Sequence, residues 1–154
     1  MMKKKIVALL MAGTMAMTLP VSTNVMAANT TDTAINFDVN ALNFDKTTGK
    51  REKQNTTPIY IHVTSLEDRS SVRVRALGVA GANSENLTNN GTSLKRVSYV
   101  TCKLKTKYSI HNDIKEKGYG YAKLGFQSLN TINSERVKGV WSPDSTKTYT
   151  HAWQ

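Results

Sequence analysis

Few side chains in this sequence have the types and spacing that catalysis or metal binding requires. The three histidines, His62, His111 and His151, lie far apart, without the i,i+3 or i,i+4 spacing that places two metal ligands on one helix face. No G-x-S-x-G elbow, phosphate-binding glycine loop or H-E-x-x-H motif occurs. We therefore expect no metal, no cofactor and no catalytic residue, and we do not expect an enzyme.

Cys102 is the single cysteine, so no internal disulfide can form. Together with His111 it could form a nucleophile and base pair, which would make the protein an enzyme. Cys102 alternates with Thr101 and Lys103, however, and so falls on the apolar side of an expected strand. This position favours a buried structural thiol.

The basic residues carry the clearest functional signal. Arg73 and Arg75 lie on one outward strand face, Lys103 and Lys105 lie on another, and Lys123 follows later in the chain. If these strands are neighbours, their charges share one sheet face and attract an anionic surface in a salt-dependent way. The alternative is a solvated face whose lysines discourage edge-to-edge aggregation.

Aromatic residues could add to such a surface. Tyr119, Tyr121 and Trp141, together with Tyr60, could form a sugar-stacking platform beside the charges. The alternative is that these rings pack against neighbouring strands.

The first residues have the pattern of a secretory signal peptide. Three lysines precede an apolar run from Ile6 to Met17, and Val25 and Ala27 form a small-residue cleavage site, so we expect cleavage after Ala27. The run is shorter than the roughly 20 residues of a lasting membrane anchor, although an uncleaved membrane helix is the alternative. Without residues 1–27 and their three lysines the net charge falls from +10 to +7, and all six methionines are lost.

The remaining chain favours an all-β fold. We expect a flexible leader over residues 28–33 and one β-rich domain over residues 34–154. Its period-two alternation predicts about six strands in a single small antiparallel β-sandwich or barrel. The expected strands begin with Ile35–Val39, Ile59–Val63 and Val72–Ala76, and continue with Val97–Tyr108, Tyr119–Leu129 and Val137–Trp141.

Two other segments lack the strand pattern. Asp45–Thr57 has no apolar residue, which predicts a solvated loop or a protruding hairpin arm. In the stretch from Ile110 to Lys117, Asn112 is a candidate cap and Gly118 a terminator, so we expect one short helical turn there.

Three motifs of the chain resemble those of a known group of proteins. They are Arg51-Glu-Lys53, Lys117-Gly-Tyr-Gly-Tyr-Ala-Lys-Leu124 and the ending Gly139-Val-Trp-Ser-Pro-Asp-Ser145. With a signal peptide, they resemble uncharacterised small secreted proteins of Gram-positive, Bacillus-like and Clostridium-like bacteria. The resemblance implies no activity and no site residues. A looser similarity, of architecture alone, is to lactococcin-type bacteriocins.

These observations lead to two functional hypotheses besides the enzyme. The first is a secreted, non-enzymatic β domain that associates with an anionic cell-wall polymer or membrane surface through its basic face. The second is a secreted bacteriocin-like or toxin-like antimicrobial protein. An extracellular location makes nucleic acid an unexpected partner, the lack of disulfides suits a Gram-positive envelope, and the oligomeric state stays open.

Overall fold

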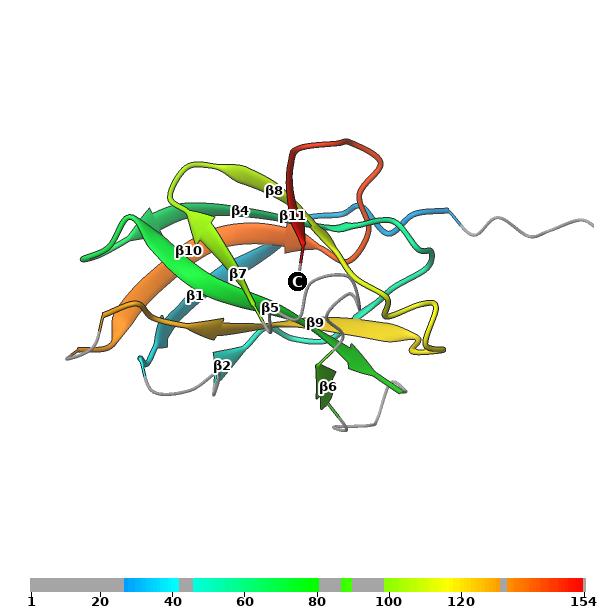
Figure 1. The fold of residues 1–154 in the computed structure, drawn as a ribbon, viewed down its shortest axis with the longest axis horizontal. Coiled ribbons are helices and arrows are strands. Elements are labelled where there is room, and N and C mark those ends of the chain that lie inside the picture. Colours follow the sequence, from blue (N-terminus) through cyan, green and yellow to red (C-terminus); the bar gives the residue numbers. More distant parts are fainter. Residues whose placement is uncertain (1–26, 42–45, 81–86, 90–98, 131–132, 154) are drawn as a thin grey trace, which may run out of the picture.

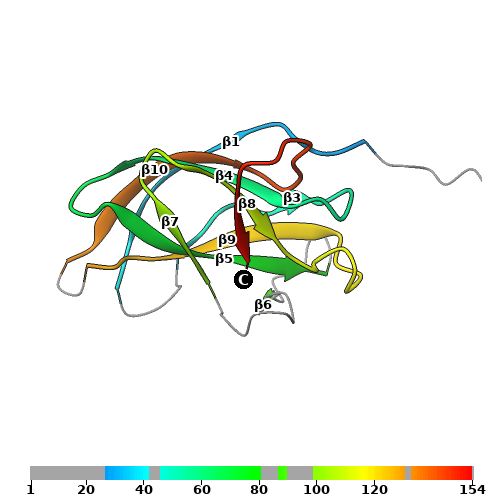
Figure 2. The same cartoon turned by 45° about the horizontal axis from the view of Figure 1, so that its top comes forward.

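The computed structural model describes residues 27–41, 46–80, 87–89, 99–130 and 133–153. These residues form a sandwich of two β-sheets, as Figures 1 and 2 show. The expected all-β sandwich is thus confirmed. The proposed signal peptide lies almost entirely outside the described residues.

Sheet A has five strands in the spatial order β1-β10-β4-β8-β11. Its strands pair in antiparallel fashion except at the end of the chain, where β11 runs parallel to β8. Their bounds are β1 Thr33–Val39, β4 Ile59–Leu66, β8 Lys107–His111, β10 Glu135–Ser142 and β11 Thr150–Trp153.

Sheet B has six strands, all paired in antiparallel fashion. Its order is β2-β9-β5-β6, and the short strands β3 and β7 also pair with β9 and β5. The bounds are β2 Lys46–Thr47, β3 Arg51–Glu52, β5 Ser71–Val79, β6 Leu87–Asn89, β7 Val100–Lys103 and β9 Tyr121–Gln127. In Figure 2, β5 and β9 form a layer below the strands of sheet A.

The core lies between the two sheets and follows the alternation of the sequence. In sheet A, Ile59, Ile61 and Val63 are 0% exposed, and Val72 and Val74 of sheet B are 0% exposed opposite them. Each buried aliphatic side chain of this kind contributes about 1.5–3 kcal/mol through the hydrophobic effect. Phe37 and Phe126 add an edge-to-face ring contact, with their centroids 5.3 Å apart.

The described residues contain eleven strands, which exceeds the expected six. The largest difference is that the expected strand Val97–Tyr108 is divided. β7 belongs to sheet B and β8 to sheet A, and the turn between them places Lys105 in the left-handed region with φ 57°. The turn is closed by a bond from the Thr106 N–H to the Lys103 carbonyl. The sequence did not predict this turn, because it contains no glycine and because the alternation of apolar and polar residues continues up to it.

The expected helical turn is a single hydrogen-bonded turn, and β8 occupies the residues before it. The Lys117 N–H donates to the Asp113 carbonyl at 3.0 Å. Asn112 acts as the expected cap, because its Oδ1 accepts from the Ile114 N–H at 3.4 Å. Gly118, with φ 82°, ends the turn in the left-handed conformation that glycine adopts without strain.

The segment expected to be a solvated loop is in part buried. Of residues 46–57, Thr48 is 6% and Lys53 0% exposed, and β2 and β3 pair with β9. The prediction of a solvated loop is therefore wrong at these positions, because hydrogen bonds and an ion pair, rather than apolar side chains, hold the segment on the sandwich. The leader residues 28–32 lack strand structure, and Asn29 nevertheless donates its backbone N–H to Asp144.

Gly139 provides a test of how closely the strands of sheet A pack. It lies at an irregularity in the pairing of β10 with β4, and a Cβ there would overlap the His62 carbonyl oxygen. We expect Gly139→Ala to lower the free energy of unfolding by about 1–3 kcal/mol, the usual cost of overpacking, in urea denaturation. Gly49→Ala is the control, since a Cβ at Gly49 meets nothing within 4 Å. Equal stabilities of the two variants would contradict the close approach.

Candidate functional site

The structure places four of the expected basic residues on one surface. Val72, Val74 and Ala76 point into the core, so the alternate residues Arg73 and Arg75 point outward from sheet B. Cross-strand partners share a face of a sheet. Lys103 lies opposite Ser71, and Lys123 lies opposite Leu77. We call Arg73, Arg75, Lys103 and Lys123 the basic face; it crosses β7, β5 and β9.

Both arginines lie against the sheet rather than extending away from it. A Cβ at Gly125, opposite Arg75, would meet the Arg75 Cγ and Nε atoms at 3.2 Å, so the arginine side chain crosses the space that this glycine leaves open. The Arg73 guanidinium lies over the Tyr99 ring, 4.6 Å from its centroid, and donates to Gln127 at 3.2 Å. These contacts fix the positions of both charges. Burial lowers the pKa of Arg75, but a guanidinium remains protonated.

The basic face is unevenly accessible. Lys103 is exposed and the two arginines are half-buried, whereas Lys123 is only 8% exposed. Lys105 is exposed but lies in the turn between the sheets, outside any strand, so the expectation that it shares a strand face with Lys103 is wrong. The side chains most accessible to a partner are thus Lys103, Arg73 and Arg75.

The expected aromatic platform is not assembled. Trp141 is 0% exposed in the core, because its position on β10 points inward, and the Arg51 guanidinium lies 6.0 Å from its ring centroid. Tyr119 precedes β9 and packs partly buried against the core, while Tyr121 lies on the outer side of sheet B. The prediction of a sugar-stacking platform that includes Trp141 is therefore wrong. Trp141 and Tyr119 instead pack against the core, as the alternative expected.

Another polar cluster, which sequence patterns did not indicate, is fully buried. Lys53 Nζ lies 3.0 Å from Asp144 Oδ1, and both side chains are 0% exposed. The ammonium also donates to the carbonyls of Thr57 at 2.6 Å and Pro143 at 2.8 Å. All three donors of the lysine are thereby satisfied. Burial lowers the pKa of Lys53, and the Asp144 carboxylate opposes this shift.

Asp144 connects several distant segments through the same cluster. Its Oδ2 atom accepts the backbone N–H groups of Asn29 at 2.9 Å and Gln54 at 3.0 Å. The Lys53 backbone N–H donates to the Gly120 carbonyl at 2.9 Å, next to β9. Asp144 follows β10 of sheet A, and Lys53 follows β3 of sheet B. One ion pair therefore joins the two sheets and the segment before β1.

The three motifs that carried the family resemblance meet at this cluster. The first supplies Lys53, the second supplies the Gly120 carbonyl, and the third supplies Asp144 together with the core residue Trp141. No single motif had the form of a site, and the resemblance itself implied no site residues, so their meeting was not expected from the sequence. That role is structural, because every one of these polar groups is bonded inside the protein.

Cys102 and His111 do not form the catalytic pair considered from the sequence. Cys102 is 0% exposed and points into the core from β7 of sheet B, whereas His111 ends β8 of sheet A on its outward side. Burial strongly raises the pKa of the Cys102 thiol, which disfavours the reactive thiolate. The expectation of a buried structural thiol is confirmed.

Within the described ranges, no group of three or more His, Cys, Asp or Glu side chains is placed to hold a metal ion. The same part of the chain has no helix with the length and apolar character to span a membrane.

The fold and the cluster describe a small β-sandwich protein whose two sheets are joined by a buried lysine and aspartate. The family model of the proteins of unknown function called DUF2712 matches residues 23–145, and the chain belongs to this family. The matched region contains both Lys53 and Asp144. No curated protein and no solved structure matches the chain significantly.

We expect Asp144→Asn to destabilise the protein severely. The substitution leaves the Lys53 ammonium buried without its counter-charge, and loss of one partner of a buried pair costs about 3–5 kcal/mol. Denaturant unfolding measures the loss. The control is Asp113→Asn, which removes the half-exposed Asp113–Lys117 pair at 2.8 Å and should cost no more than about 0.5 kcal/mol. Similar losses for the two variants would contradict the role assigned to Asp144.

Cys102 predicts a pH dependence of stability. A folded-state pKa raised above the ordinary value of 9.0 means that the unfolded chain loses its thiol proton first. The stabilising contribution is therefore complete below pH 9 and decreases as the pH rises through 9, by up to about 1.4 kcal/mol per pH unit. Urea unfolding between pH 8 and 10 should therefore show the stability difference between the wild type and Cys102→Ala decrease as the pH rises, because Lys53 and Tyr60, whose pKa values are also shifted, contribute equally to both proteins. Rapid labelling of the native thiol by a disulfide reagent would contradict the burial.

Proposed function

We propose that this chain is a secreted, non-enzymatic β domain of a Gram-positive bacterium that associates with the anionic polymers of the cell envelope through its basic face. The sequence supports the location, with its signal-peptide pattern and its resemblance to small secreted proteins of such bacteria. The chain outside its first 27 residues carries a net charge of +7, which favours an anionic partner. The anionic partner of this proposal is a polymer of the cell wall.

The position of the two arginines is the observation that carries the proposal. Arg73 and Arg75 lie on β5, which has β9 on one side and β6 and β7 on the other. Charged side chains that prevent edge-to-edge aggregation of a sheet lie on its edge strands. An outward arginine on an interior strand does not protect a sheet edge from aggregation. Arg73 lies over the Tyr99 ring and Arg75 lies over Gly125, so the two arginines form a fixed, positively charged surface.

Such a surface attracts a polyanion without a specific pocket. The fixed arginines lose little side-chain entropy when they bind, since their contacts already order them. The exposed Lys103 next to them adds a third charge. The attraction is electrostatic, so it weakens as salt shortens the Debye length from about 10 Å at 0.1 M to about 3 Å at 1 M. The antimicrobial alternative stays a prediction, since none of these contacts favours it.

Sedimentation with purified Gram-positive cell walls tests the proposal. We expect the protein to sediment with the walls at low salt, to be released by about 1 M salt, and to bind less to walls stripped of their anionic polymer. The double variant Arg73→Gln/Lys103→Gln should bind about 30-fold more weakly, at about 1 kcal/mol per basic residue near an anionic surface.

The matched control removes the same charge from the other sheet. Lys107→Gln/Lys138→Gln, at two exposed positions of sheet A, should keep most of the affinity. Absence of binding at low salt, or equal losses in the two double variants, would overturn the proposal. Unfolding curves of both variants establish that any loss of binding is not a loss of fold.

A further inference from the structure

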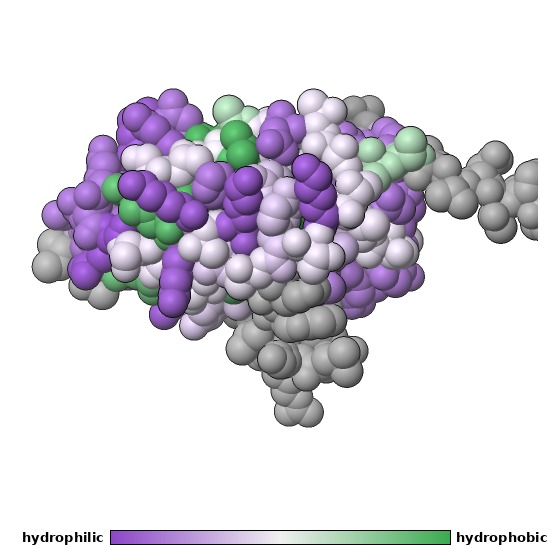
Figure 3. Space-filling model, turned by 90° about the horizontal axis from the view of Figure 1, so that it is seen from above, coloured by the Kyte–Doolittle hydropathy of each residue, from purple (hydrophilic) through white to green (hydrophobic). Residues whose placement is uncertain are grey.

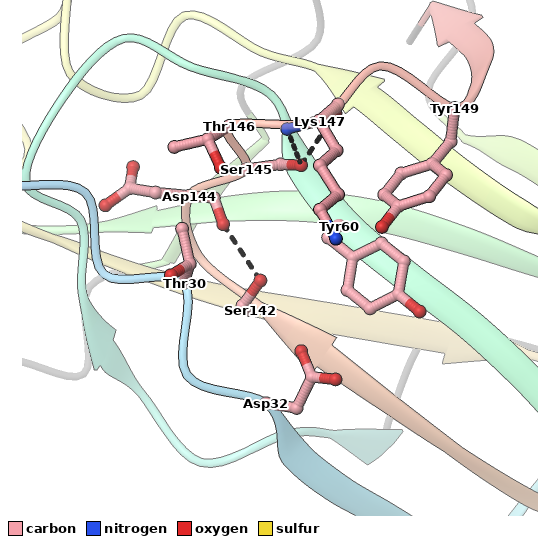
Figure 4. Close-up of a pocket in the computed structure, with 9 residues that line it drawn as sticks. All are labelled: Thr30, Asp32, Tyr60, Ser142, Asp144, Ser145, Thr146, Lys147 and Tyr149. Atoms are coloured by element: carbon pink, nitrogen blue, oxygen red, sulfur yellow. Dashed lines mark hydrogen bonds between the residues drawn. The ribbon is translucent and has the colours of Figure 1, made fainter.

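A polar depression of about 360 Å³ lies on the outer side of sheet A (Figure 4). This volume is within the ~300–1,000 Å³ range of small-molecule sites. Three parts of the chain form it: the segment before β1 contributes Asp32, the strands β4 and β10 contribute Tyr60 and Ser142, and the segment before β11 contributes Lys147 and Tyr149. The surface on this side of the molecule is mainly hydrophilic (Figure 3).

Two tyrosine rings provide the apolar part of the depression. Tyr60 points away from the core, because its neighbours Ile59 and Ile61 point inward and are 0% exposed. Its ring lies against that of Tyr149, with the centroids 5.0 Å apart and an interplanar angle of 39°. Burial raises the pKa of Tyr60, and the nearby Asp32 carboxylate and Tyr149 add to the shift. This ring pair lies outside the core cluster, so packing of the core does not account for it.

The wall opposite Asp32 is held in place by hydrogen bonds. The Tyr149 N–H donates to Ser109 Oγ on β8 at 3.0 Å, and the Ser145 N–H donates to Thr57 Oγ1 at 3.1 Å. Ser145 Oγ donates to the Lys147 carbonyl at 2.8 Å. The same segment begins at the buried Asp144, so the depression is already formed without a ligand. Binding therefore costs little conformational entropy in this segment.

We propose that this depression is a binding site for a neutral carbohydrate. Asp32 and Lys147 are both exposed and reach toward it from opposite sides (Figure 4), so their charges compensate and select neither an anion nor a cation. A carboxylate accepts hydrogen bonds from the hydroxyl groups of a sugar, and the ammonium donates to them. The partly exposed Tyr149 ring, which packs on Tyr60 with its 8% exposure, covers the C–H surface of the sugar. The site is distinct from the basic face, which lies on the other sheet, and it does not depend on the proposed envelope association.

Nuclear magnetic resonance titration of the purified protein with neutral trisaccharides tests this site. The probes are the trisaccharides of glucose, galactose and N-acetylglucosamine, each added up to about 10 mM, at which a millimolar site is filled. We expect at least one of them to shift the Tyr60 and Tyr149 resonances saturably, with an affinity that high salt leaves unchanged. If none of the three shifts these resonances, the site is not a neutral-sugar site and the inference is overturned.

Two variants and one control locate the binding. Tyr149→Ala removes one ring, Asp32→Asn removes the exposed carboxylate with little risk to the fold, and each should weaken the binding about 10-fold or more. Lys103→Gln, on the basic face, should leave it unchanged. Retained affinity in both site variants would place the sugar elsewhere and would also overturn the inference. Wall binding by the basic face is measured in the absence of these sugars, so either proposal can fail without the other.

Discussion

The ion pair between Lys53 and Asp144 is the constraint on which the rest of the structure depends. An ammonium and a carboxylate that are both 0% exposed are tolerated only when every donor and acceptor has a partner. Two carbonyls and two backbone N–H groups meet this requirement, and they come from segments far apart in the chain. The pair therefore fixes how the two sheets join, where the segment before β1 lies, and where the wall beside Tyr149 begins.

The two candidate binding surfaces use opposite sides of the same sandwich. On sheet B, the register of β5 with β7 and β9 brings Arg73 and Lys103 onto one face. On sheet A, the path of the chain from Asp144 to Tyr149 crosses the ends of β4 and β10 and forms a depression lined by groups of both charges. The first surface is suited to a polyanion and the second to an uncharged polar ring. Neither surface needs the core to move.

The sequence predicted the core well and the polar interactions poorly, for physical reasons. Period-two alternation indicates which side chains of a strand are buried. It therefore predicted the strands around Ile61 and Val74 and the burial of Cys102. Lys53 lies in a wholly polar segment, and no pattern distinguishes a buried charge with its partners from a solvated one. The turn at Lys105 has no glycine. The sequence left open whether Trp141 belongs to an exposed platform or packs against neighbouring strands, and its burial decides for packing. The spatial neighbourhood of the basic residues depended on strand pairing, which a single sequence does not give.

A double-mutant cycle on the buried pair tests the central claim most directly. The free energy of unfolding is measured for the wild type, Lys53→Met, Asp144→Leu and the double variant. If the pair is one unit, each single substitution leaves an uncompensated buried charge, and the double variant is much more stable than the sum of the single losses implies, with a coupling energy of about 2 kcal/mol or more. Losses that simply add would show that the two side chains act independently and would contradict the account.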